Sequence, residues 1–467
     1  MRGSRGIIFG ALVLASPAWA DHTSLHFTAT GDASATDNLF ATNNDRQPDV
    51  FVTVRPGVLY AYDAPRMIHD FTGELEAIEY LAHSDNPSLS GRGGWRAVIL
   101  PGPRSSVTMS IDAGTGVVTS LANRTSADET VALAAPSGNV ETQQVSVSES
   151  TSYQTSEHTR LTQGALGRYA TTDDNAGSTT DTREISGNLG FERQFQHDSL
   201  LLNATVSYLL LSRDAPAGTP FGTGRDHQLN PGGSLAWHHD WNQRWSHAAN
   251  AGISVVHPVG NDPNDPTATR KTSLFWVAGA GLAYTEVWGR AYFSVDRSVA
   301  PNLLLAENTL DENVNLQVSM PLPFLDDTKR NPKLVGQASI GYSHSELINS
   351  DSGDTEGNIN VGHLDLSVGY TPRPGQTFGV RYEFVYQRSG EPIVMPGSIA
   401  VAAFPTYFRN TLSFTFSLRV PDRVAGEVPR RNKSIRSDRS DLVPVGSEPV
   451  VTDPLEGGEG DQGNGDR

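Results

Sequence analysis

Side chains capable of chemistry gather in a few short runs of this sequence. His238, His239 and Asp240 form the most suggestive cluster. Neighbouring residues of a strand point to opposite faces, so only His238 and Asp240 could share a site, and two ligands hold a metal ion poorly. His197-Asp198-Ser199 lies at a predicted turn and has the same weakness. We therefore expect polar strand ends at both places rather than catalytic or metal sites.

Other signatures of catalysis are missing from the sequence. It contains no Gly-x-Ser-x-Gly elbow, no phosphate loop and no zincin helix. With 0 cysteines, disulfides and thiolate zinc sites are excluded. The run Asn261–Pro266 offers oxygens to calcium, but without the fixed spacing of a calcium loop an ordinary acidic surface loop is expected. The net charge of -17 argues against a nucleic-acid partner. These features predict a protein that is no enzyme and needs no cofactor.

The clearest structural signal is an alternation with a period of two. The segment 408–420 places aromatic and aliphatic residues at most of its even positions and mainly hydroxyls and arginines at its odd positions. Its length of about a dozen residues exceeds the five or six of an average soluble strand and suits a tilted membrane strand. The same pattern recurs in 377–387, 200–210, 290–296, 313–320 and 184–194.

Short turns alternate with longer polar connections between these segments. Turn residues such as Arg373-Pro374-Gly375 contrast with long stretches such as 260–271. This alternation favours an all-β, transmembrane antiparallel up-and-down β-barrel of about 18 strands (range 16–20), with turns in the periplasm and loops outside. A soluble β-helix or sandwich array gives no reason for it. The strands are expected near 24–33, 50–62, 66–82, 92–100, 104–118, 143–153, 157–171, 183–196, 198–213, 225–240, 243–258, 272–285, 287–299, 311–322, 333–347, 357–372, 375–389 and 407–420.

The two ends of the chain differ from the barrel. Residues 1–20 have the three parts of a Sec signal peptide, with cleavage expected between Ala20 and Asp21, and their apolar run is too short to span ~30 Å as a helix. Residues 21–421 are expected to form the barrel in the bacterial outer membrane. Residues 422–467 are basic and then acidic, rich in Gly and Pro, and are expected to be a disordered periplasmic tail.

Charged residues on the polar face of the strands are the candidate site. Both signs occur among them, with hydroxyl and amide residues between, which suits a hydrated pore that conducts a polar solute. Each could equally serve wall stability alone. The candidate lumen-lining residues are Arg55, Arg66, Asp70, Glu74, Glu76, Glu184, Glu192, Arg290, Asp296, Arg381, Glu383, Arg409 and Arg419. Six aromatic residues near strand ends, Trp237, Trp241, Trp245, Trp276, Tyr284 and Trp288, are expected to form interfacial girdles.

Three short motifs resemble a known family. Thr36-Asp37-Asn38-Leu39-Phe40 is followed by Asp49-Val50-Phe51-Val52-Thr53-Val54-Arg55-Pro56-Gly57-Val58, and the last strand opens with Phe408-Arg409-Asn410. Together they resemble outer-membrane β-barrel proteins associated with exopolysaccharide assembly loci. The resemblance spans about 36–420 and implies a porin-like barrel that passes polysaccharide through the outer membrane together with a periplasmic polysaccharide-export protein. It implies no catalytic residues.

Several functions remain open on the sequence alone. The leading hypothesis is a channel for exopolysaccharide or another polar polymer, in contact with outer-membrane lipids. The alternatives are a general diffusion porin for small hydrophilic solutes and a structural or adhesive surface barrel without transport. An outer-membrane hydrolase is a more distant alternative.

Overall fold

The computed structural model describes most of the chain between residues 22 and 420. The described residues are 22–39, 46–84, 87–117, 140–174, 179–214, 224–260, 270–286, 288–302, 307–322, 333–348, 353–373, 375–390, 393–394, 401–402 and 406–420. In these ranges we find no helix that is long and apolar enough to cross a membrane.

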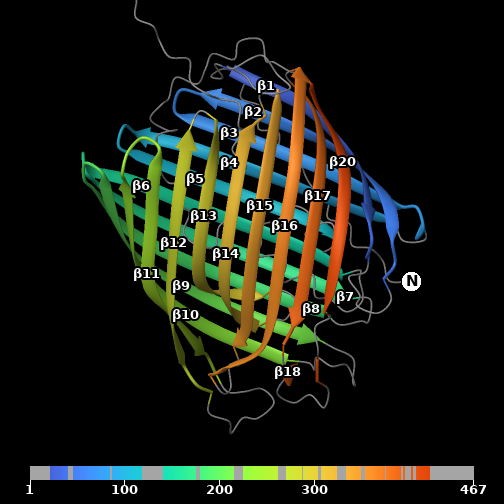
Figure 1. The fold of residues 1–467 in the computed structure, drawn as a ribbon. Coiled ribbons are helices and arrows are strands. Elements are labelled where there is room, and N and C mark those ends of the chain that lie inside the picture. Colours follow the sequence, from blue (N-terminus) through green and yellow to red (C-terminus); the bar gives the residue numbers. More distant parts are fainter. Residues whose placement is uncertain are drawn as a thin grey trace, which may run out of the picture.

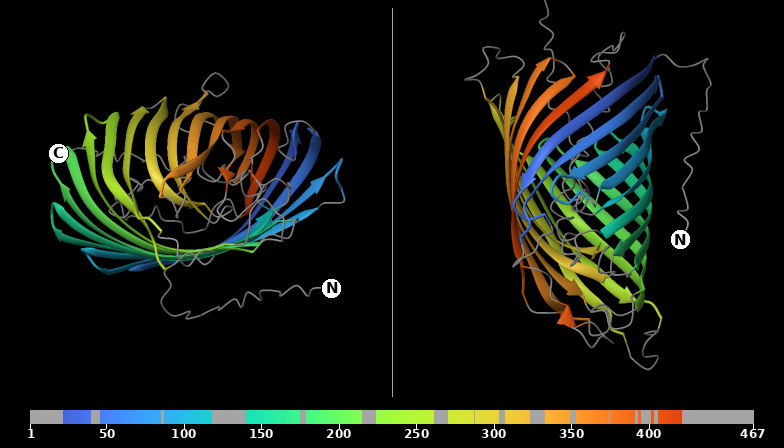
Figure 2. Two further views of the ribbon diagram at one scale, coloured as in Figure 1. Left: turned by 90° about the horizontal axis from the view of Figure 1, so that it is seen from below. Right: turned by 90° about the vertical axis from the view of Figure 1, so that its right-hand side faces the viewer.

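Eighteen long strands form one closed antiparallel sheet (Figure 1). Each strand pairs with its neighbours in chain order, and β1 closes the barrel by pairing with β20 from Phe27↔Val420 to Thr36↔Thr411. End-on, the wall has an elongated rather than circular outline (Figure 2). The strands are β1 (His22–Thr36), β2 (Asp49–Ala64), β3 (Met67–Tyr80), β4 (Ser88–Gly102), β5 (Ser105–Val117), β6 (Val140–Ser156), β7 (Thr159–Asp174), β8 (Thr179–Gln194), β9 (Asp198–Asp214), β10 (Gly224–Asp240), β11 (Trp245–Pro258), β12 (Ser273–Glu286), β13 (Gly289–Asn302), β14 (Glu307–Pro321), β15 (Leu334–Ile348), β16 (Thr355–Arg373), β17 (Gln376–Ser389) and β20 (Tyr407–Val420).

The predicted up-and-down barrel and its strand count are therefore confirmed. Six observed strands, β1, β2, β4, β6, β14 and β16, are at least three residues longer than predicted, whereas β3, β5, β11 and β17 are shorter. β4, for example, begins at Ser88 rather than at residue 92. Two very short strands, β18 (Ile393–Val394) and β19 (Val401–Ala402), pair with each other between β17 and β20. The signal segment with Ala20 and Asp21, the run Asn261–Pro266 and the tail 422–467 lie outside the described residues.

The two ends of the barrel differ in their connections. We call the end that carries the short links, such as those after β2, β4 and β6, the turn end, and the opposite end the loop end. The link between β14 and β15, residues 322–333, is the long exception at the turn end that the sequence showed. Gly375 lies in the turn before β17 with φ of 78°, in the left-handed region that glycine adopts without strain.

The sheet register separates an apolar outer face from a polar inner face. On β9 the even positions point outward, and Leu202 and Val206 are 59% and 46% exposed. On the inner face, Glu76 and Gln228 are buried, with only 2% and 0% of their surface exposed. The apolar stretch of β9 runs from Leu200 to Leu210, which at ~3.3 Å per residue and a tilt of about 40° gives a band about 25 Å tall. A band of this height matches the hydrocarbon layer that an outer-membrane barrel crosses.

Most of the expected girdle aromatics gather at the turn end of β10–β13. Trp245 and Tyr284 have ring centroids 4.5 Å apart, and Tyr284 lies 5.6 Å from Trp288. Trp276 instead lies towards the loop end of β12, where the guanidinium of Arg297 sits 4.1 Å from its ring centroid. Aromatic rings at both borders of the apolar band are typical of membrane interfaces.

Candidate functional site

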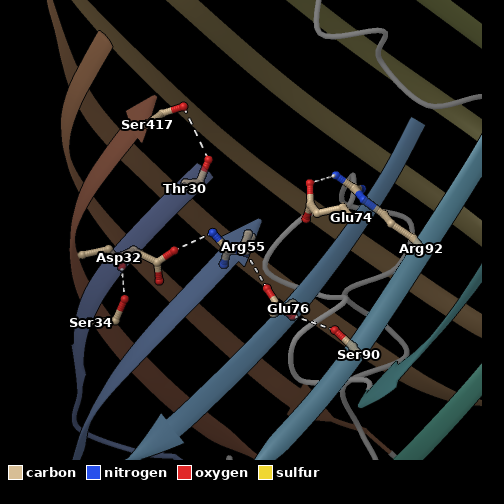
Figure 3. A network of polar contacts seen from close by, with 10 residues as sticks. Thr30, Asp32, Ser34, Arg55, Glu74, Glu76, Ser90, Arg92 and Ser417 are labelled. Carbon is tan, nitrogen blue, oxygen red and sulfur yellow. Dashed lines mark hydrogen bonds and ion pairs between the residues drawn. The ribbon is translucent and has the colours of Figure 1, made fainter. Parts of the chain in front are cut away.

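A chain of charged side chains crosses the inner wall of β1–β4. Arg55 lies between two carboxylates: its Nη1 donates to Asp32 Oδ1 and its Nε to Glu76 Oε2, each at 2.5 Å (Figure 3). Ser90 Oγ donates to the other oxygen of Glu76 at 3.1 Å. The side chains of Arg55, Asp32 and Glu76 are only 19%, 9% and 2% exposed. Three charges so far removed from water must compensate one another, because an unpaired buried charge is very costly.

Further ion pairs continue this pattern around the same half of the barrel. On β16, β17 and β20, Arg381 pairs with Asp365 and lies 3.2 Å from Glu383, which also accepts from Arg409 at 3.4 Å. On β7 and β8, Arg160 Nη2 lies 2.5 Å from Glu192 Oε2. More exposed, Arg92 Nη2 contacts Glu74 at 3.2 Å. This half of the wall thus carries arginine–carboxylate pairs at successive heights.

The other half of the wall is mostly uncharged. Along β9–β15 the register directs chiefly hydroxyl and amide side chains inward, among them Asn203, Thr205, Ser207, Asn230, Ser234, Asn250, Ser254, Asn313, Asn315, Gln317, Ser339 and Ser343. Such groups both donate and accept hydrogen bonds without attracting counter-ions. The interior therefore has one side rich in arginine–carboxylate pairs and another side on which hydroxyl and amide groups outnumber charged groups.

The structure places the sequence-predicted lining residues as follows. All of them except Arg66 lie on strand positions that face inward by register. Arg66 lies in the two-residue link between β2 and β3, so the predicted strand start at residue 66 was one residue too early. Asp296 accepts from Asn313 Nδ2 at 3.1 Å, and Glu184 is the register partner of Arg168. Arg290 lies near the turn end, opposite Ser319.

Sequence reasoning missed several members of the charged half. Asp32 and Asp365 lie within predicted strands and could have been found by extending the same alternation. Arg160 and Arg168 lie in a stretch that alternates poorly, because the outward positions of β6 and β7 include Glu149 and Gln163. The pairing of these residues depends on strand register, which no pattern within one strand reveals.

At the loop end, side chains of well-separated strands meet inside the barrel. On β10, Asp226 accepts from Arg270 and, at 2.5 Å, from Gln228 Nε2. Gln228 in turn accepts from Asn308 of β14. Gln228 and Asn308 are 0% and 1% exposed, so this chain of four polar side chains is buried. We call Asp226, Gln228, Arg270 and Asn308 the latch.

The latch can form only if the strand ends bend inward over the opening of the barrel at the loop end. In a circular barrel of 18 strands tilted by about 40°, strands four positions apart are separated by roughly 23 Å, and a glutamine and an asparagine joined by a hydrogen bond span roughly half of that. An apolar cluster of Val256, Leu310 and Ile348 accompanies the latch. Ser273 Oγ also donates to the carbonyl of Gly353 at 2.7 Å. The opening of the barrel at the loop end is therefore narrowed on the side of β10–β16.

The runs with catalytic potential do not assemble into a site. His238 Nε2 lies 3.0 Å from Asp240 Oδ1 on the inner face, whereas His239 is on the outer face, 2.8 Å from Asp198. Ser199 is the register partner of His238 and so lies on the face opposite to Asp198. In the part of the chain that the structure describes, no three His, Cys, Asp or Glu side chains come close enough to hold a metal ion.

Similarity to known proteins is limited to solved structures. No protein-family model and no curated protein sequence matches the chain. Among solved structures, OccAB3 of Acinetobacter baumannii is similar, with 9% identity, a TM-score of 0.44 and coverage of 85% of this chain and 99% of its own. OccK2 (OpdF) of Pseudomonas aeruginosa in complex with glucuronate reaches 11% identity and 0.44, covering 86% and 99%. The ferric citrate transporter FecA in its unliganded form reaches 8% and 0.46, covering 85% and 78%. At these values none of the three carries an argument about this chain.

Proposed function

We propose that this chain is an outer-membrane channel that translocates exopolysaccharide or another polar polymer. The observation that carries the proposal is the contrast between the two faces of the wall, an apolar band outside and charged, hydroxyl and amide side chains inside. A closed barrel of 18 strands is wide enough to enclose an aqueous passage. On the β9–β15 side, hydroxyl and amide groups offer donors and acceptors to sugar hydroxyls.

The orientation in the membrane follows from the ends of the sheet. β1 begins at the turn end and β20 ends there. With export by the signal segment and cleavage after Ala20, both ends of the barrel strands are then periplasmic and the loop end faces the exterior. A periplasmic polysaccharide-export protein would meet the channel at the turn end.

An in-frame deletion in the source strain tests the function. We expect secreted polysaccharide to fall by about tenfold or more and polymer to accumulate in the periplasm, because a large hydrophilic chain cannot cross hydrocarbon unaided. Restoring the full chain should restore secretion. A deletion strain that secretes its polymer normally contradicts the proposal, and wide, ungated conductance of the purified protein in planar bilayers would then favour a general porin.

Embedding in the membrane has its own test at Val206, in the middle of the outward apolar band. Val206→Arg places a charge where lipid tails are expected, so we expect it to lower the free energy of unfolding by about 2–4 kcal/mol. The matched control is Ser207→Arg, one residue further on the inner face, with an expected change of about 0.5 kcal/mol. Urea unfolding in lipid vesicles measures both. Equal effects of the two variants would show that the outer face does not meet lipid.

A further inference from the structure

A pocket of about 410 Å³ lies in the inner wall towards the turn end of β1–β5 and β20. Its lining includes Leu59 and Ala61 of β2, Asp70 and Thr72 of β3, and Arg419 of β20. Arg96 of β4 and Asp112 of β5 also line it. The pocket is separate from the latch, which lies at the opposite end of the barrel.

The hollow exists because small residues occupy inward positions of the wall. Gly94 is the inward residue of β4 between Thr72 and Asp112. A Cβ at Gly94 would lie 2.9 Å from Asp112 Oδ1 and 3.0 Å from Thr72 Oγ1, so any larger side chain there would displace these groups or fill the space. Glycine at position 94 thus keeps the pocket open.

Two arginines of this pocket differ from most of the other inward arginines. Arg55, Arg92, Arg160, Arg381 and Arg409 all contact carboxylates. Among the described residues, neither Arg96 nor Arg419 forms an ion pair or side-chain hydrogen bond, although Asp70 is the register partner of Arg96. The Nε of Arg419 is buried without a hydrogen-bond partner. A buried donor left unsatisfied is costly, and a ligand oxygen would relieve that cost.

The chemistry of the lining selects one kind of ligand. The fork of a guanidinium group matches a planar carboxylate. Asp70 and Asp112 accept hydrogen bonds from hydroxyl groups, and Leu59 and Ala61 offer an apolar surface to the C–H face of a sugar ring. The volume lies within the range of small-molecule sites. Because the two carboxylates balance the two arginines, recognition depends on placing one acid group among several hydroxyls rather than on net positive charge.

We propose that this pocket binds a carboxylate-bearing sugar, such as a uronic acid residue of a polymer in transit, between Arg96 and Arg419. The acid group lies on Arg419, whose Nε lacks a hydrogen-bond partner, and Arg96 donates to ring hydroxyls on the other side of the pocket. The inference rests on the proposed passage of polysaccharide and adds the substrate class. Each guanidinium supplies charge-assisted hydrogen bonds, so the loss of either should weaken binding by about tenfold or more.

Isothermal titration of the full chain in detergent tests the proposal, with glucuronate, glucose and inorganic phosphate as probes. We expect glucuronate to bind at least about tenfold more tightly than glucose or phosphate. Arg419→Gln should lose this preference, and Arg96→Gln should bind glucuronate about tenfold more weakly than the wild type. Gly94→Val should abolish binding by filling the pocket. Arg244→Gln, which removes an arginine that is 63% exposed in the turn between β10 and β11, should bind glucuronate like the wild type. Heat-modifiable migration on gels verifies that each variant is folded.

The outcomes separate the pocket from the proposed function. Three results would contradict the proposed carboxylate-sugar pocket. They are glucose binding as tight as that of glucuronate, phosphate binding as tight as that of glucuronate, and glucuronate binding like that of the wild type by the folded variants Arg96→Gln and Arg419→Gln. If the deletion strain fails to secrete polymer while the purified chain does not bind glucuronate, the proposed channel function is supported and the proposed pocket is contradicted. If the chain binds glucuronate through both arginines while the deletion strain secretes normally, a carboxylate-sugar site exists in a barrel with another role.

Discussion

Asp226→Ala is expected to raise the single-channel conductance of the purified protein by about two- to threefold, because it releases the narrowed loop end. Asp226 accepts from both Arg270 and Gln228, and its side chain and that of Arg270 are 9% and 6% exposed. Removing one partner of a buried ion pair costs about 3–5 kcal/mol. The strand ends that bend inward over this opening can avoid that cost by moving apart and exposing Arg270 to water. Planar-bilayer recordings measure the change.

The matched control lies on the same strand and face. Asp240→Ala removes an inward aspartate at the turn end of β10, where Asp240 is 27% exposed and contacts His238. It should leave the conductance at the wild-type value. Gln228→Ala, which removes the hydrogen bond from Asn308, should give a smaller increase than Asp226→Ala. A conductance of Asp226→Ala equal to that of the wild type would show that the latch does not limit the passage.

Arg55→Met is expected to lower the free energy of unfolding by about 3–5 kcal/mol. The substitution keeps much of the side-chain volume but leaves Asp32 and Glu76 facing each other in a wall region where they are 9% and 2% exposed. Two buried carboxylates without a cation repel each other and lack their strongest hydrogen-bond donor. Urea unfolding in lipid vesicles, followed by tryptophan fluorescence, measures the loss.

Two comparisons identify the cause of that loss. Arg92→Met breaks the pair with Glu74, but Arg92 is 58% exposed, so we expect a change of about 1 kcal/mol or less. The triple variant Asp32→Asn/Arg55→Met/Glu76→Gln removes the charges together and should recover much of the stability. If Arg55→Met and Arg92→Met were equally destabilised, burial of the Asp32–Arg55–Glu76 network would not be the reason.

The barrel was predictable from the sequence because lipid and water impose opposite demands on the two faces of every strand. Leu202 and Val206 on the outside, with Asn203 and Ser207 between them, make that alternation visible within a single segment. Strand ends were less visible. β4 begins four residues before its predicted start, because Ser88, Leu89 and Ser90 continue the alternation with a single apolar residue.

The contacts of the interior were predictable only in part. The inward direction of Arg55 and Glu383 follows from the periodicity of their own strands, but their partners depend on the register between strands. The latch joins residues 80 positions apart on strands that are not neighbours in the sheet. It arises from inward bending of the strand ends, which no local pattern encodes.

The seam between β1 and β20 has a consequence for how the protein folds. It joins residues nearly a whole barrel apart in sequence; Thr30 and Ser417, whose hydroxyls lie 3.4 Å apart, are separated by 387 positions. Contacts of such high order form late and slowly. Until they form, the sheet presents two unpaired edges that attract other chains. Pairing of β1 with β20 is thus the slow step of folding. A chain that lacks either strand cannot close the barrel and keeps both sheet edges unpaired.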